Sequence, residues 1–478
     1  MNDPSAMPVS SPSDAGPQPM PVPFGVEAET GNTRPPLSEA DLEQIPVDPQ
    51  AVKARASAEG HLALVPTINA MDLSQTGWGV VFASDIDPAV KAALQPLLEH
   101  REKQVGNPRR FKTFEGNHGV RPGQSATDWL DRQGVSLAVV DPRNGVPYYL
   151  LLVGSPTQIS FEFQFVLDAQ WCVGRVHFDT PAEYESWARA VVDYETSASL
   201  PHRKHAAMWM TRHAGDAATT ILLSQVGMPF VKQGLGAEDG YTLQPFVDAQ
   251  ATKEQLANIL RGTLENGPPA VLFTGSHGLE WSKADADGQR QHQGALLTQE
   301  WIPHTSVKPE HYFSAGDLGD DSKVQGMICF LFACFGGGCP TLDTYRSQPD
   351  GSPIEIAPAP MIAKLPQRLL SRGALAVMAH VDRAWSWSFQ SGSGLPQNQV
   401  IRSTIEAVMQ GARVGQAGDF FNLQWATLAA LLGVLQGRHI QPVSPAALGN
   451  LFIARDDARN YTLLGDPAAR LRVEAMQT

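Results

Sequence analysis

The sequence predicts an α/β protein, a three-layer α/β/α sandwich on a mainly parallel sheet. From about residue 77 onward, short continuous apolar runs alternate with segments of helical spacing. Runs that are apolar on both faces are typical of parallel strands covered by helices on both sides. The chain has 478 residues, of which 42% are hydrophobic, so it can bury a large core.

The composition of residues 1–55 predicts a disordered Pro-rich tail. The first 50 residues hold 11 of the 37 prolines, eight acidic residues and a single basic one. Such a composition buries too little apolar surface to offset the entropy of ordering. Solubility is its simplest role, and a pro-segment or a docking site for a regulatory partner is the alternative.

Residues 56–200 predict an N-terminal α/β half. Three apolar runs predict strands at 77–83, 135–140 and 147–154. Helical spacing predicts helices over 87–104 and 181–196, and Asp87 followed by Pro88 is typical of a helix start.

Residues 201–478 predict a second α/β half, which we expect to be catalytic. Strands are expected at 218–224, 269–275, 326–334 and 374–380. Helices are expected at 251–264, at 361–373 with a kink or shortening at Pro366, and over roughly 398–437.

Charge and cysteine usage exclude several classes of function. The net charge is −13 and no long basic block occurs, which argues against a nucleic-acid partner. No signal peptide and no apolar run long enough for a membrane span is recognisable. Four cysteines suit a reducing cytoplasm, and their spacing does not predict a metal site.

Two complementary reactive groups follow two of the predicted strands. "VLFTGSHGLEW" ends its apolar run at His277, and "MICFLFACFGGGCP" ends its run at Cys334. The segment "HVDRAW" (380–385) follows a third strand. Reactive residues of parallel sheets lie at the carboxyl ends of strands, so the three segments are expected to meet at one edge.

A cysteine and a histidine at one edge suit nucleophilic catalysis. A free thiol is mostly protonated at neutral pH, and a nearby imidazole can take its proton and later return it. The N–H of Gly278 is open to an incoming carbonyl, and glycines 336–338 let the chain turn sharply and let a substrate approach.

These motifs resemble the caspase-like superfamily of cysteine peptidases, closest to its gingipain-type and CHAT-domain branches. "TGSHG" (274–278) resembles the His-Gly motif, and "FLFACFGGG" (330–338) resembles the Ala-Cys motif. "NYTLLGDPAARLRV" (460–473) resembles the closing segment of those families. The resemblance covers roughly 210–475, and the preceding half resembles the extra half of gingipain-type catalytic regions.

The resemblance implies a role for each matched residue. Cys334 matches the nucleophile, His277 the base, and the N–H groups of Gly278 and Cys334 the oxyanion hole. No cofactor is expected to be needed for this chemistry. Cys329 is expected to be core, and Cys339, expected on an exposed loop, is the rival nucleophile or a redox thiol.

The substrate pocket departs from the family pattern. Several caspase-like families cut after Arg or Lys because an acid lies two residues before the nucleophile, where this chain has Phe332. Asp382 is the expected substitute, with Trp385 and Trp387 as pocket walls, which predicts cleavage after Arg or Lys. In the alternative, Asp382 pairs with Arg383 or caps a turn, and the tryptophans are plain core.

We therefore expect a cytoplasmic cysteine endopeptidase that acts on protein substrates, with a role in a bacterial defence or death pathway implied by the resemblance. A non-catalytic caspase-like scaffold that binds a partner protein is the alternative. An acyltransferase or another cysteine hydrolase would use the same dyad. The tail and the segment 282–325 are the expected control elements.

Overall fold

The computed structural model describes most of the chain. The described residues are 22–38, 40–41, 64–65, 67–137, 139–390, 394–437 and 444–477. Within these ranges, no helix is both long enough and apolar enough to cross a membrane. The parts of the predicted tail before residue 22 and from 42 to 55 lie outside the described residues.

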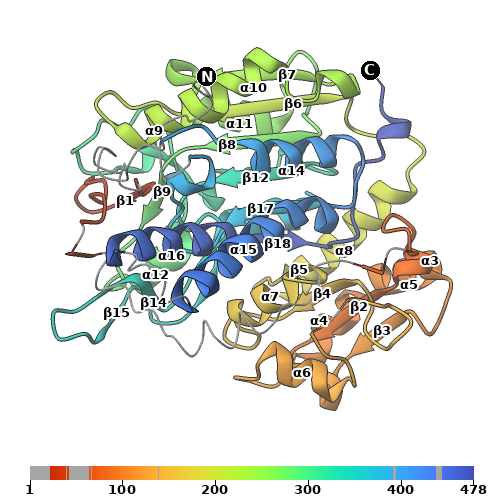
Figure 1. Cartoon of the computed structure of the whole chain (residues 1–478). Helices are drawn as coiled ribbons and strands as arrows, with labels where there is room; N and C mark the ends of the chain where they lie inside the picture. Colours follow the sequence, from red (N-terminus) through yellow and green to blue (C-terminus); the bar gives the residue numbers. More distant parts are fainter. Residues whose placement is uncertain are drawn as a thin grey trace, which may run out of the picture.

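A single ten-stranded sheet forms the centre of the molecule (Figure 1). Its strands, in spatial order, are β3 (Phe111–Phe114), β2 (Trp78–Phe82), β4 (Tyr149–Val153), β5 (Cys172–Val176), β18 (Tyr461–Gly465), β17 (Ala376–His380), β12 (Ile328–Phe332), β8 (Val271–Gly275), β6 (His205–Met210) and β7 (Thr242–Val247). The strands β2, β4, β5, β8, β12, β17 and β18 are buried along their whole length, as apolar runs on both faces predict.

The sheet is parallel throughout except at one junction, where β17 and β18 run antiparallel. β18 comes from the C-terminal end of the chain but pairs with β5 from the first half. The carboxyl ends of β8, β12 and β17 therefore lie at one edge of the sheet. The expected fold class, a mainly parallel sheet between helices, is confirmed.

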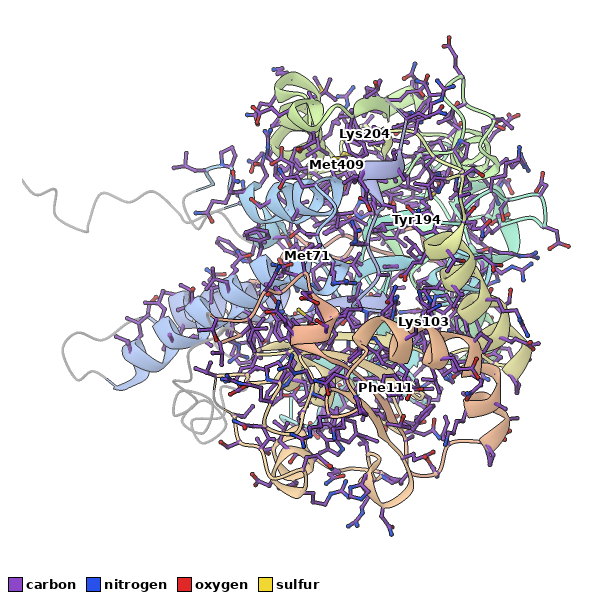
Figure 2. All side chains as sticks on the ribbon, turned by 90° about the vertical axis from the view of Figure 1, so that its right-hand side faces the viewer. Met71, Lys103, Phe111, Tyr194, Lys204 and Met409 are labelled. Carbon is purple, nitrogen blue, oxygen red and sulfur yellow. The ribbon has the colours of Figure 1, made fainter. Side chains whose placement is uncertain are left out.

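Helices cover both faces of the sheet. Figure 2 looks along the sheet, with α14 and α15 in blue on one side and α8 in yellow on the other. The helices are α3 (Leu73–Thr76), α4 (Pro88–Ala93), α5 (Gln95–Val105), α6 (Ala126–Arg132), α7 (Phe161–Asp168), α8 (Pro181–Thr196), α9 (Ala217–Leu222), α10 (Met228–Gln233), α11 (Lys253–Arg261), α12 (Ala286–His292), α13 (Lys364–Ser371), α14 (Gln399–Met409), α15 (Val414–Gly437) and α16 (Pro445–Arg459).

Two of the expected strands are absent. Residues 218–224 lie in α9 and in the π-helical turn that follows it, because Asp216 caps the helix by accepting from the backbone N–H of Thr219. In the segment 135–140 the described residues form no strand, and only Val140 makes a bridge, to Leu64. The expected helix over 87–104 is divided at Leu94 into α4 and α5, just before Pro96.

The expectation of a fully disordered tail is wrong for residues 22–38, which we call the strap. Its strand β1 (Gly25–Glu27) pairs in parallel with β9 (Gly278–Glu280), beside which it lies in Figure 1. β9 continues through β10 (Leu296–Leu297) to β11 (Tyr312–Phe313) in a four-stranded sheet. Two further two-stranded sheets are β13 (Gly338–Cys339) with β16 (Met361–Ile362) and β14 (Leu342–Ser347) with β15 (Pro353–Glu355).

The strap is ordered because it buries apolar side chains. Phe24 and Val26 are fully buried and Leu37 nearly so, each in a different apolar cluster. The composition average over 50 residues hides these three positions among prolines and acids. Their burial and the added backbone hydrogen bonds supply the stabilisation that the composition alone does not predict.

The buried Asp466 joins the closing segment to the first half of the chain. Its carboxylate accepts from Arg101 Nε at 2.6 Å and from Trp78 Nε1 at 2.9 Å. Arg101 in turn pairs with Glu195 on α8. Asp466 of the closing motif therefore has a structural contact in this chain, and it lies outside the edge that carries His277 and Cys334.

Candidate active site

His277 and Cys334 follow two neighbouring strands. β8 and β12 pair in parallel register, with Gly275 opposite Phe332, and each reactive residue lies two positions beyond its member of that pair. Both side chains are fully buried. The backbones also touch, because a Cβ placed on Gly278 would lie 1.9 Å from the carbonyl oxygen of Cys334. Only glycine therefore fits at position 278, beside the backbone of the candidate nucleophile.

Asp216 holds the imidazole of His277. The distance from His277 Nε2 to Asp216 Oδ2 is 3.0 Å, and the other ring nitrogen, Nδ1, has no hydrogen-bond partner among the described residues. Burial alone would raise the pKa of the Asp216 carboxyl, but His277 and two hydrogen bonds from Thr219 hold it well below its usual range. Asp216 therefore stays ionised and orients the ring.

A second histidine lies against the first. The rings of His213 and His277 stack with centroids 6.2 Å apart, and His213 Nε2 lies 3.0 Å from the carbonyl oxygen of Thr298. Burial lowers the pKa of His213 to about 4, so this ring is neutral at neutral pH. Sequence reasoning missed both Asp216 and His213. The helix-capping pattern "DAAT" (216–219) is the signal that could have placed Asp216.

The thiol of Cys334 is enclosed by main chain. Its Sγ lies 3.3 Å from the backbone nitrogen of Ala384 and 3.6 Å from the carbonyl oxygen of the same residue. Burial raises the pKa of this thiol, and the N–H of Ala384, the nearby Arg383 and the backbone of Phe24 oppose the rise only in part. The sulfur is thus a neutral thiol while the strap is in place.

The candidate oxyanion donor is already engaged. The N–H of Gly278 donates to the carbonyl oxygen of Phe24, with an N···O distance of 2.9 Å. A Cβ placed on Gly25 would lie 3.7 Å from the sulfur of Cys334. The peptide bond between Phe24 and Gly25 therefore runs past the thiol with its carbonyl oxygen on the Gly278 amide.

Asp382 has local partners. Its carboxylate accepts from Thr344 Oγ1 at 2.6 Å and from the backbone N–H of Arg383 at 2.7 Å. Burial raises its pKa to about 6, against the opposing effect of Arg383. The guanidinium of Arg383 instead pairs with Glu280 and Asp343. The contacts of Asp382 give no support to a role as the acid that binds a basic substrate side chain.

Trp385 and Trp387, the expected pocket walls, are buried in a small apolar cluster with Leu37 of the strap and Tyr345. Two residues of α16, Phe452 and Ile453, complete the same cluster. The tryptophans thus pack against the outer part of the strap.

The other cysteines are also buried. Cys329 lies inside β12, as expected for a core residue. Cys339 is fully buried in β13, so its expected place on an exposed loop is wrong; its Sγ accepts from Gln293 Nε2 at 3.5 Å. Among the described residues, no group of three or more His, Cys, Asp or Glu side chains could hold a metal ion.

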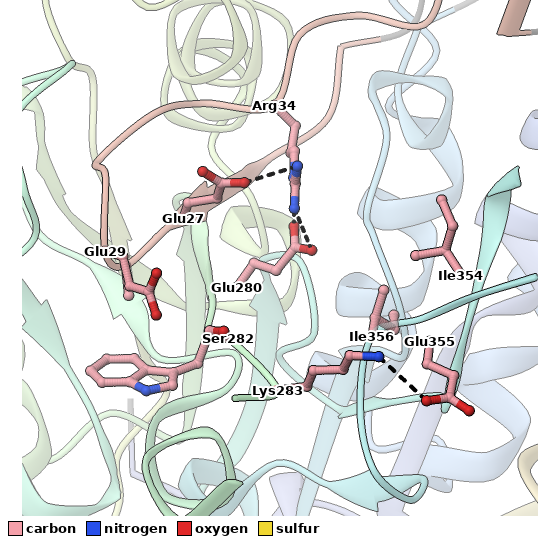
Figure 3. Close-up of a pocket in the computed structure, with 11 residues that line it drawn as sticks. Glu27, Glu29, Arg34, Glu280, Ser282, Lys283, Ile354, Glu355 and Ile356 are labelled. Atoms are coloured by element: carbon pink, nitrogen blue, oxygen red, sulfur yellow. Dashed lines mark hydrogen bonds and ion pairs between the residues drawn. The ribbon is translucent and has the colours of Figure 1, made fainter. Parts of the chain in front are cut away.

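A cavity of about 260 Å³ adjoins the strap. Figure 3 shows Arg34 of the strap between Glu27 and Glu280 in its lining, and Lys283 bonded to Glu355. Arg34 binds both oxygens of Glu280, at 3.0 and 2.9 Å. The buried Glu280 therefore links the strap to Arg383.

No family model matches this chain, and no curated protein matches its sequence. Similar solved structures include the Arg-specific cysteine proteinase gingipain R, at 13% identity and a TM-score of 0.46, over 84% of this chain and 79% of that one. The complex of the Porphyromonas gingivalis RgpB pro- and mature domains has 11% identity and a TM-score of 0.45, over 83% and 80%. A structure described as a protease has 15% identity and a TM-score of 0.46, over 83% and 78%.

Proposed function

We propose that this chain is a cysteine endopeptidase in which Cys334 is the nucleophile and His277 the general acid and base. The observation that carries the proposal is the peptide carbonyl of Phe24, held by the Gly278 N–H beside the Cys334 thiol. A peptidase needs a main-chain carbonyl at that place, within reach of both a nucleophile and a hydrogen-bond donor.

The acylation step uses the groups of this edge. His277 takes the proton of the Cys334 thiol, and the sulfur attacks the carbonyl carbon of the substrate peptide bond. The carbonyl oxygen gains charge, which the N–H groups of Gly278 and Cys334 stabilise. The C–N bond breaks, and His277 gives its proton to the leaving amine. An S-acyl enzyme remains.

Hydrolysis of the S-acyl enzyme completes the cycle. His277 accepts a proton from water, and the resulting hydroxide attacks the acyl carbon. The C–S bond breaks, the acid product leaves, and the proton returns to the sulfur. Asp216 holds Nε2 of His277, so it acts as a positioning residue that leaves Nδ1 of the ring free to exchange the proton with the sulfur.

Active-site labelling tests the proposal. A peptidyl acyloxymethyl ketone, which alkylates activated thiols, should attach to Cys334 in an Arg34→Gln variant, which loses the bonds between the strap and Glu280. Mapping by mass spectrometry should find Cys172, Cys329 and Cys339 unmodified. Cleavage of peptides by the same preparation separates a peptidase from an acyltransferase. Labelling absent at Cys334, with binding of a peptide retained, would favour the non-catalytic scaffold. A role in bacterial defence or death is carried by the sequence resemblance alone.

A further inference from the structure

The course of the strap through the candidate site defines a peptide-binding cleft. This inference rests on the proposed function and concerns the class of polypeptide that the site accepts. On one side of Cys334 the strap is extended: Phe24 N–H donates to the carbonyl oxygen of Ala384, and Ser386 N–H donates to that of Val22, each at 3.3 Å. Pro23 forms an antiparallel bridge with Trp385 between these two bonds.

On the other side of Cys334 the strap pairs with β9. Gly25, Val26 and Glu27 lie opposite Gly278, Leu279 and Glu280 in parallel register. Ala28 N–H then donates to the carbonyl oxygen of Glu280 at 3.3 Å. Main-chain hydrogen bonds thus hold an extended peptide on both sides of the thiol, the mode in which proteins add a strand to an open edge.

The side chain of Phe24 fills an apolar site. Its ring lies edge-on to Phe332 at a centroid distance of 4.9 Å and to Phe389 at 6.0 Å. The ring of His277 is 5.9 Å away, and Phe24 itself is fully buried. An aromatic ring therefore stands where the substrate residue before the scissile bond would stand, and an apolar ring, Phe332, lies beneath it.

The next position has room for only a small residue. A Cβ on Gly25 would meet Cys334 Sγ at 3.7 Å and Glu280 Oε2 at 3.8 Å, which is ordinary contact. Alanine fits there beside glycine, and a larger side chain would press on the sulfur or on the ion pairs of Glu280.

We propose that residues 22–25 occupy the cleft as a substrate does, so that the enzyme cleaves extended polypeptides after a large apolar or aromatic residue and before glycine or alanine. Phe332 sets this preference, and a basic side chain finds no carboxylate partner in the contacts of Phe24. The same occupancy blocks other substrates until the strap moves, and the bonds of Arg34 to Glu280 help to hold it.

The experiment loosens the strap without changing the cleft. Gly31 has φ +67°, and a Cβ on it would lie 1.5 Å from the carbonyl oxygen of Thr305, so Gly31→Ala must displace the turn. Gly123→Ala is the matched control, because Gly123 has φ +73° and nothing within 4 Å of the added Cβ. Arg34→Gln is a second loosening variant, should Gly31→Ala fold poorly.

The substrates are internally quenched peptides Val-Pro-Xaa-Gly-Val-Glu, with Xaa as Phe, Leu, Ala, Arg, Lys or Asp. In the full chain, Gly31→Ala should raise the cleavage rate of the Phe peptide at least about tenfold over wild type, while Gly123→Ala should not. In the loosened variant, kcat/KM for Phe should exceed that for Arg by about 10²-fold, because an unpaired charge is costly to bury in an apolar site.

The outcomes separate this inference from the proposed function. Cleavage with Arg, Lys or Asp favoured over Phe would overturn the inference and leave the peptidase intact. If no peptide is cleaved, anisotropy with labelled peptides on the Gly31→Ala, Cys334→Ala double variant decides. Tighter binding of the Phe peptide than of the Arg peptide would then support the occupancy of the cleft and its apolar preference, and would reject the peptidase. Equal or no binding would reject the inference as well.

Discussion

The backbone N–H of Gly278 donates a hydrogen bond to the carbonyl oxygen of Phe24, two residues that are 254 positions apart in the chain. Gly278 follows the candidate base, and Phe24 belongs to a segment whose composition predicts disorder. The bond places a main-chain carbonyl oxygen on the N–H group that would stabilise the oxyanion in acyl transfer. The Cys334 thiol beside this bond is fully buried, and burial raises its pKa so that it is neutral in this structure.

Replacement of the nucleophile is the first prediction. Cys334→Ala should abolish peptide cleavage, because no other group at this edge can form the S-acyl intermediate. Its melting temperature should stay close to that of wild type, since the change removes one sulfur. Cys339→Ala is the matched control, because Cys339 lies five residues after Cys334 and is equally buried. The Cys339→Ala variant should keep its activity. Loss of activity in Cys339→Ala, with activity retained in Cys334→Ala, would show that Cys334 is not the nucleophile.

Asp216→Asn tests the positioning of the imidazole. Asparagine still caps α9, but as a neutral amide it can hold the wrong tautomer of His277, so kcat should fall by about 10²–10⁴-fold with little change in KM. His277→Ala should cost at least about 10²-fold. Asp87→Asn, at the cap of α4, serves as the control for loss of a capping charge. A raised KM with unchanged kcat in Asp216→Asn would indicate a purely structural role.

The reactive pair could be predicted from the sequence because local pattern and topology agree. Continuous apolar runs before His277 and Cys334 predict buried parallel strands, and parallel strands bring their carboxyl ends to one edge. β8 and β12 are neighbours in register, as that argument requires. The need for glycine at position 278 follows from its contact with the Cys334 backbone, which leaves no room for a Cβ.

Two parts of the site could not be predicted in this way. Asp216 reaches His277 from the start of a helix, and the apolar run "ATTILLS" suggested a strand there. The strap pairs with β9, which lies about 250 residues later in the chain, so nothing in its own composition reveals the partner edge. The local signals of burial within the strap are its apolar residues, of which Phe24, Val26 and Leu37 are the most deeply buried and Val22 is partly buried.

The raised pKa of Asp382 predicts a pH-dependent stability. Its carboxyl has a folded pKa of about 6 against 3.8 in the unfolded chain, so the folded state binds this proton more tightly. Asp382 contributes most to the free energy of unfolding below pH 3.8. This contribution, about 3 kcal/mol, is lost as the pH rises toward 6. Asp382→Asn should remove that loss, and it suits the φ of +74° at this position.

Urea unfolding of both proteins from pH 4 to pH 7 measures this effect. The stability of Asp382→Asn relative to wild type should rise over that range, because other titrating groups cancel in the difference. A constant difference would contradict the account of Asp382. The ratio of cleavage after Phe to cleavage after Arg should be unchanged in this variant.

Asp466 should be important for stability. Asp466→Ala removes the fully buried partner of Arg101 Nε and of Trp78 Nε1, which should cost about 3–5 kcal/mol in the free energy of unfolding. Glu474→Ala, which breaks an exposed pair with Arg470, should cost less than about 1 kcal/mol. Equal losses in the two variants, measured by urea unfolding, would show that the Asp466 contacts contribute little.

The cleavage profile of an unbiased peptide library, for wild type, Gly31→Ala and Cys334→Ala, tests the central claim most directly. We predict that cleavage disappears in Cys334→Ala and is faster in Gly31→Ala than in wild type. The cleaved bonds should be those that follow large apolar residues. Cleavage that persists in Cys334→Ala, or the absence of any cleavage by the loosened variant, would contradict the assignment of this chain as a cysteine endopeptidase.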